Sequence, residues 1–136
     1  MRITNGKVLI FFGVIHPLLG ISQFAFGKQF VSFSSKYFFR ISNGLSEFPL
    51  LNGQMNYENF AAFWFFYFGI LLIPIGILLN YVERELKVIP NSFVLGYLIV
   101  VLIGAYMIPF SGMTIFMLPH ALIMLAQNRK RAKILK

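Results

Sequence analysis

The chain has no cysteine and few acidic residues. None of its 136 residues is Cys, and four are Asp or Glu against twelve Lys or Arg. Without a thiol the chain has no cysteine nucleophile, no disulfide and no zinc-thiolate site. We predict no catalytic residues and no dedicated metal site.

Charge of either sign is scarce, and this scarcity indicates the fold class. Charged residues make up 12% of the chain and hydrophobic residues 58%, with a mean hydropathy of +0.76. A soluble globule of this size needs more polar surface. Four apolar stretches come near the roughly 17 to 25 residues that cross a bilayer, although the last is short. We therefore expect a single all-α transmembrane domain, an antiparallel four-helix bundle with spans at about 8–26, 60–81, 92–108 and 112–126.

The first stretch also has features of a signal peptide. Arg2 and Lys7 precede it, and Ala25-Phe26-Gly27 resembles a small-residue cleavage site. We interpret the stretch as a span that the protein keeps.

Basic residues are unevenly distributed around the expected spans. Lys and Arg near span ends stay on the cytoplasmic side. With a cytoplasmic N-terminus the outer side holds Lys28, Lys36 and Arg40. The inner side then holds nine basic residues: Arg2, Lys7, Arg84, Lys87, Arg129, Lys130, Arg131, Lys133 and Lys136. We expect a multi-pass protein with both termini in the cytoplasm.

The net charge of +8 and the basic C-terminal sequence NRKRAKILK also suit a nucleic-acid partner. A basic cluster directly after a span is more typical of contact with anionic lipid headgroups. We expect membrane lipids as partners and no nucleic acid.

Residues 28–58 form the longest connection between expected spans. The segment is too polar to span and is rich in aromatic residues, including Phe30, Phe33, Tyr37 and Phe38. Residues 29–42 read as an amphipathic helix in the outer headgroup region, or as an extracellular lid over the bundle mouth.

Small residues share one face of each of the first two expected spans. At about 100° per residue, Gly13, Gly20 and Gly27 fall on a stripe with His16 and Gln23. The stripe of the second span contains Ala62, Gly69, Gly76 and Asn80. Small residues let helices approach closely in lipid, so we expect these glycines to be helix-packing residues.

The fourth expected span carries a different stripe and the bundle carries two aromatic belts. The stripe contains Met113, Met117, His120, Met124 and Gln127. Trp64, Tyr67 and Tyr106 fall toward the outer interface, and Tyr81 and Tyr97 toward the inner one.

Two histidines fall inside expected spans at a similar depth, and each is next to a proline. Pro17 follows His16, and Pro119 precedes His120. Ionisable residues and broken helices inside a membrane face protein or a cavity. The sequence therefore predicts a buried polar pocket, for which the candidates are His16, Gln23, Trp64, Tyr67, Asn80, Tyr106, Met117 and His120. We predict no cofactor; His16, His120 and Met117 would be the ligands if a haem or copper ion were bound.

Four blocks of the chain support a resemblance to a known family. They are GKVLIFFGVIHPLLG, AAFWFFYFGILLIPIG, Pro90 ahead of the third span, and PFSGMTIFMLP. Together they resemble an uncharacterised bacterial family of small four-span membrane proteins, a domain of unknown function. The matching positions are His16, Ala62, Phe63, Trp64, Pro109, Ser111 and Gly112, whereas His120 is not a shared feature. The resemblance implies a bacterial cytoplasmic membrane and no known activity.

Several functions fit these features. We favour a module that binds a lipid or another lipophilic small molecule in the pocket. An accessory subunit that stabilises another membrane protein, or a homo-oligomer, is the main alternative. A membrane enzyme or a haem or copper protein using His16 comes next, and a transporter last, because no charged residue lies within a span to couple transport.

Overall fold

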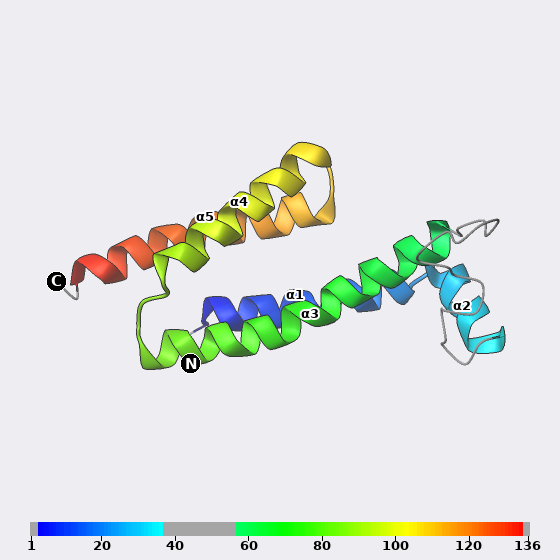
Figure 1. The fold of residues 1–136 in the computed structure, drawn as a ribbon, viewed down its shortest axis with the longest axis horizontal. Coiled ribbons are helices and arrows are strands. Elements are labelled where there is room, and N and C mark those ends of the chain that lie inside the picture. Colours follow the sequence, from blue (N-terminus) through cyan, green and yellow to red (C-terminus); the bar gives the residue numbers. More distant parts are fainter. Residues whose placement is uncertain (1–2, 37–56, 135–136) are drawn as a thin grey trace, which may run out of the picture. The chain divides into compact units, whose positions relative to one another are not determined.

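The structure is a computed structural model that describes residues 3–36 and 57–134, except for the side chain at position 113. These residues form five α-helices and no strand, which confirms the all-α prediction (Figure 1). The helices are α1 (Asn5–Ile21), α2 (Gly27–Lys36), α3 (Tyr57–Glu85), α4 (Asn91–Met107) and α5 (Gly112–Ile134). Arg2, Tyr37, Phe38, Arg40 and Lys136 lie outside the described residues.

The first helix ends five residues before the predicted boundary at residue 26. Ser22 is the cause, because its hydroxyl donates to the Leu19 carbonyl and accepts from the Phe24 amide. A serine that bonds its local backbone competes with the helix ladder. The turn then closes with the Phe26 amide donating to the Gly20 carbonyl at 3.0 Å. Residue 23 therefore lies in the turn, and Gly27 begins α2.

The remaining helices differ from the predicted spans mainly in length. The third helix has 29 residues and extends beyond 60–81 at both ends, while α4 is within one residue of 92–108. The fifth helix continues to Ile134 instead of ending at 126, because the basic tail residues are good helix formers. Of the described helices, α3 is long and apolar enough to cross a membrane, and α1 and α4 are apolar but shorter.

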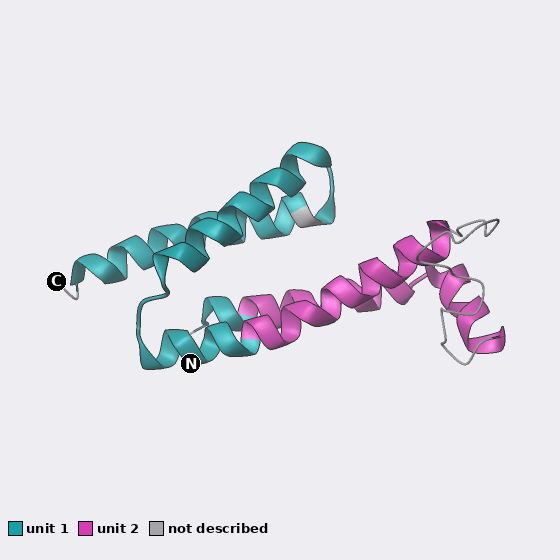
Figure 2. Cartoon of the chain, in the orientation of Figure 1, with its two compact units in different colours: residues 1–7, 77–136 teal, residues 8–76 magenta. Residues whose placement is uncertain are grey.

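The chain divides into two compact units, shown in Figure 2. Unit 1 consists of residues 1–7 and 77–136, and unit 2 of residues 8–76. Each is described below by itself.

Unit 2 contains the close pairing of α1 with α3 and a small aromatic core. The core consists of Phe30, Phe33 and Ala62, with Phe26 and Phe66 packed against it. The two buried phenylalanines are three residues apart on one face of α2, while Lys28, Val31 and Lys36 are exposed. This is the amphipathic pattern expected for residues 29–42, of which residues 37–42 lie outside the described residues.

Unit 1 contains a hairpin of α4 and α5, which lie side by side. The buried apolar side chains of this hairpin come from both helices: Val94, Val101, Met117, Ala121 and Met124. Met117, His120 and Met124 of the α5 stripe are thus buried in unit 1, where Tyr97 of α4 meets His120, whereas Gln127 is exposed.

Candidate functional site

His16 lies on α1 against an aromatic surface of α3. Its ring stacks on Phe65 with centroids 3.8 Å apart and planes 18° apart. Phe68 meets the ring edge-on at 6.0 Å. The imidazole is half-buried. A polar ring thus lies among apolar side chains, where its nitrogens can form a hydrogen bond with a group that reaches them.

The position of His16 depends on the close approach of α1 and α3. A Cβ atom added at Gly69 would lie 2.5 Å from Pro17 Cδ and 2.9 Å from His16 Cδ2. At Gly13 it would lie 2.7 Å from Ile73 Cγ1, and at Gly20 it would lie 2.8 Å from Phe65 Cδ1. These three glycines therefore form the seam between the two helices.

The other predicted pocket residues of unit 2 take different positions. Gln23 is exposed in the turn after α1, so it does not share a helix face with His16. Trp64 and Tyr67 are partly exposed on α3, where both rings contact Phe63. Gly27 packs against the Ser22 carbonyl inside the turn rather than against another helix, and Gly76 is buried.

In unit 1, His120 pairs with Tyr97 across the α4–α5 hairpin. The Tyr97 hydroxyl and His120 Nδ1 are 3.0 Å apart, and His120 is buried. Met117 is also buried, one turn before His120. Tyr106 is 88% exposed at the end of α4, and Met113 lies outside the described side chains.

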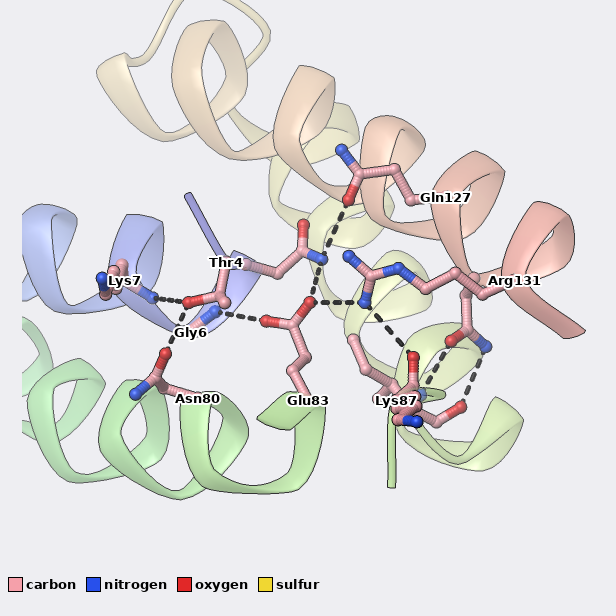
Figure 3. Close-up of polar contacts among 11 residues, drawn as sticks. Thr4, Gly6, Lys7, Asn80, Glu83, Lys87, Gln127 and Arg131 are labelled. Atoms are coloured by element: carbon pink, nitrogen blue, oxygen red, sulfur yellow. Dashed lines mark hydrogen bonds and ion pairs between the residues drawn. The ribbon is translucent and has the colours of Figure 1, made fainter. Parts of the chain in front are cut away.

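A network of polar side chains surrounds the beginning of α1 in unit 1 (Figure 3). The carboxylate of Glu83 is its centre. Oε1 accepts from Asn5 Nδ2 at 2.8 Å and from Arg131 Nη1 at 3.0 Å, and Oε2 accepts from the Gly6 amide at 3.0 Å. A carboxylate at a helix N-terminus is favoured by the helix dipole, and Arg131 balances its charge.

Thr4 and Asn80 extend this network. The Thr4 hydroxyl accepts from the Lys7 amide at 3.3 Å, which makes Thr4 the N-cap of α1. It donates to Asn80 Oδ1 at 2.6 Å. Asn80, predicted as a pocket residue, thus bonds the start of α1.

Asn128 of α5 holds the connection between α3 and α4. Its side-chain oxygen accepts from the Ile89 amide at 2.8 Å, and its nitrogen donates to the Ile89 carbonyl at 2.9 Å. The same nitrogen donates to Asn91 Oδ1 at 3.0 Å. This side chain is buried, so its bonds replace those that water would make.

Sequence reasoning missed the residues that carry the polar network: Asn5, Glu83, Asn128 and Arg131. The charge distribution of the sequence places Arg131 among the inner basic residues and assigns no role to Glu83. The signal that was available is the alternation in VERELK, where Glu83 falls on the α3 helix face that also carries Asn80.

In the part of the chain that the structure describes, no three His, Asp or Glu side chains gather as a metal site. The haem or copper alternative, with His16, His120 and Met117 as ligands, stays a prediction.

Comparison with known proteins bears on the family. The model of a family described as "Family of unknown function (DUF6463)" matches residues 1–131. The chain belongs to this family. No curated protein and no solved structure matches the chain. The resemblance predicted from the four sequence blocks is therefore confirmed at the level of an uncharacterised domain.

Proposed function

We propose that the protein is a multi-pass integral membrane protein, with α1, α3, α4 and α5 embedded in the bilayer. The observation that carries this proposal is the distribution of polarity. The exposed side chains of α4 include Leu95, Ile99, Val100, Leu102 and Ile103. The buried polar residues of the described chain are Asn5, Glu83, His120 and Asn128. Helices that are apolar outside and polar inside suit a lipid solvent.

A bacterial cytoplasmic membrane with both termini inside fits this proposal. The exposed basic residues of unit 1 include Lys87, Arg129, Lys130 and Lys133. Their charges lie beyond the ends of the apolar stretches, as the positive-inside rule requires for a cytoplasmic side.

Within this membrane protein, we propose that His16 contacts a bound lipid or another lipophilic small molecule. The support is the half-buried imidazole on the Phe65 ring, in an otherwise apolar part of α1. A ligand with an acyl chain and a polar head would match such a surface, because apolar walls with a few polar groups are typical of ligand sites.

Native mass spectrometry of protein released from a mild detergent tests the ligand directly. The wild-type protein should retain a lipophilic molecule, and both His16→Ala and His16→Phe should lose it. His16→Phe keeps an aromatic ring on Phe65 and removes the polar atoms. Leu18→Ala, at an exposed α1 position two residues away, is the matched control. Equal retention by all four proteins would contradict the His16 site.

An accessory subunit is the second candidate, and Gly96 favours it. A Cβ added at Gly96 meets no atom within 4 Å, so α4 presents an open small-residue position. A helix of another membrane protein, or of a second copy, could approach there closely. In the same mass measurement, a protein partner or a dimer in place of a small molecule would support this alternative.

A further inference from the structure

The hairpin of α4 and α5 has an apolar tip, formed by residues 106–112. Tyr106, Met107, Ile108 and Phe110 are exposed by 88%, 71%, 63% and 97%. Four large side chains exposed within residues 106–110, at the end of α4 and in the turn after it, make an apolar patch that is unfavourable in water. The chain has no charged residue between Lys87 and Arg129, so no charged side chain holds the tip in water.

The uncharged parts of the two arms are short for a full crossing. The helix α4 has 17 residues, which corresponds to about 25 Å at 1.5 Å per residue, and the part of α5 before Arg129, residues 112–128, has the same length. The hydrocarbon core of a bilayer is about 30 Å thick, and an average tilt of about 20° shortens the reach further. With its charged ends at one headgroup region, the hairpin therefore ends near or below the opposite hydrocarbon boundary.

The turn also satisfies backbone groups from within the hairpin. The Ile108 amide donates to the Gly104 carbonyl at 2.9 Å, and the Ser111 amide donates to the Ile108 carbonyl at 3.2 Å. Pro109 has no amide hydrogen to satisfy.

Side chains complete this arrangement at the start of α5. The Ser111 hydroxyl accepts from the Thr114 amide at 3.1 Å, and the Thr114 hydroxyl donates to the Ile108 carbonyl at 2.9 Å. Irregular backbone at membrane depth requires such internal partners, because lipid chains offer none.

We propose that the tip of the α4–α5 hairpin is inserted among the acyl chains of the leaflet opposite its charged ends, as a re-entrant wedge that does not emerge into water. The partner of this surface is lipid. The inference rests on the proposed membrane function and adds a depth for the tip.

Spin-label accessibility in liposomes of phosphatidylcholine and phosphatidylglycerol tests this depth. The absence of native cysteine allows single-cysteine labelling without background. The label sites are Phe110→Cys at the tip, Ile99→Cys in the arm and Lys133→Cys at the charged end; all three residues are exposed in the structure. Relaxation by oxygen reports lipid contact, and relaxation by a water-soluble nickel chelate reports water contact.

The expected result is that Phe110 resembles Ile99, with strong relaxation by oxygen and at least several-fold weaker relaxation by nickel than Lys133. A Phe110 label as open to nickel as Lys133, with Ile99 protected, would overturn the wedge and leave the membrane proposal intact. A Phe110 label shielded from both reagents would overturn it in favour of a covering protein. Nickel access at Ile99 as well would contradict the membrane proposal itself.

Discussion

Glu83 of α3 and Arg131 of α5 form an ion pair, with Oε1 and Nη1 3.0 Å apart and the Glu83 side chain 1% exposed. The carboxylate also accepts from the Gly6 amide and the Asn5 side chain. One acidic side chain therefore joins the beginning of α1, the end of α3 and the basic part of α5 within unit 1. Because the Glu83 carboxylate is buried, removing its charge or its partner costs more than breaking an exposed ion pair.

Replacing Glu83 should destabilise the protein. We expect Glu83→Gln to lower the free energy of unfolding by about 3 kcal/mol, because Arg131 would lose the carboxylate that balances its charge. Thermal or denaturant unfolding in mild detergent measures this loss. Glu85→Gln, at an exposed position two residues later, should stay within about 0.5 kcal/mol of wild type. Equal effects of the two variants would contradict a structural role for the ion pair.

Asn128 gives a second test in unit 1. Asn128→Ala leaves the buried Ile89 amide and carbonyl without their side-chain partner. We expect a loss of about 2 to 4 kcal/mol, because each unsatisfied buried group costs about 1 to 3 kcal/mol. Amide hydrogen exchange at Ile89 should accelerate together with this loss. Arg129→Ala changes the neighbouring exposed residue and should leave the Ile89 amide protected. Equal acceleration at Ile89 in both variants would contradict a specific role of the Asn128 side chain.

Composition and spacing predicted the helical elements because helix formation depends on local properties of the sequence. An apolar run between Glu58 and Glu83 defines α3, and an apolar run between Pro90 and the turn at Pro109 defines α4, whatever the helices contact. Gly13, Gly20 and Gly69 could be placed on helix faces for the same reason, and the structure puts them where α1 meets α3. The end of α1 was misplaced because the hydrogen bonds of the Ser22 hydroxyl are invisible to a hydropathy pattern.

The polar network could not be predicted because its members are far apart in the chain. Asn5 and Glu83 are separated by 78 positions, and Asn5 and Gln127 by 122. Helical periodicity reports one face at a time and does not show which faces meet. Asn80 was placed in a ligand pocket by its face, and only the tertiary structure shows that it bonds Thr4.

Tyr97 tests the interior of the α4–α5 hairpin. Tyr97→Phe removes the hydroxyl 3.0 Å from His120 Nδ1 and keeps the ring. We expect a loss of about 1 to 3 kcal/mol, because a buried polar atom loses a hydrogen-bond partner. The imidazole nitrogen chemical shifts of His120 should change in the same variant. Tyr106→Phe, at the exposed end of α4, should leave both the stability and these shifts unchanged; shifts that move equally in both variants would contradict a direct Tyr97–His120 bond.

Substitutions of two glycines on different helices, Gly69 and Gly96, should change the stability in opposite directions. Gly69→Ala would place a Cβ atom 2.5 Å from Pro17 Cδ, so α1 and α3 must separate or shift. We expect this overpacking to cost about 1 to 3 kcal/mol. Gly96→Ala meets no atom within 4 Å and replaces glycine within α4. It should stabilise the isolated chain by about 0.5 to 1 kcal/mol, because alanine has the higher helix propensity.

The changes in unfolding free energy are measured on monomeric protein in the same detergent. The sign for Gly69→Ala tests the close approach of α1 and α3, and the sign for Gly96→Ala tests whether α4 is open at that position. A neutral Gly69→Ala would mean that α1 and α3 lie farther apart than the 2.5 Å distance between the added Cβ atom and Pro17 Cδ indicates. A destabilising Gly96→Ala would mean that α4 is covered at that point. The same Gly96→Ala comparison in the membrane separates the two candidate functions. If a partner helix packs at Gly96, the added methyl group should weaken that association. If only lipid contacts α4 there, the gain in unfolding free energy should be the same as in detergent.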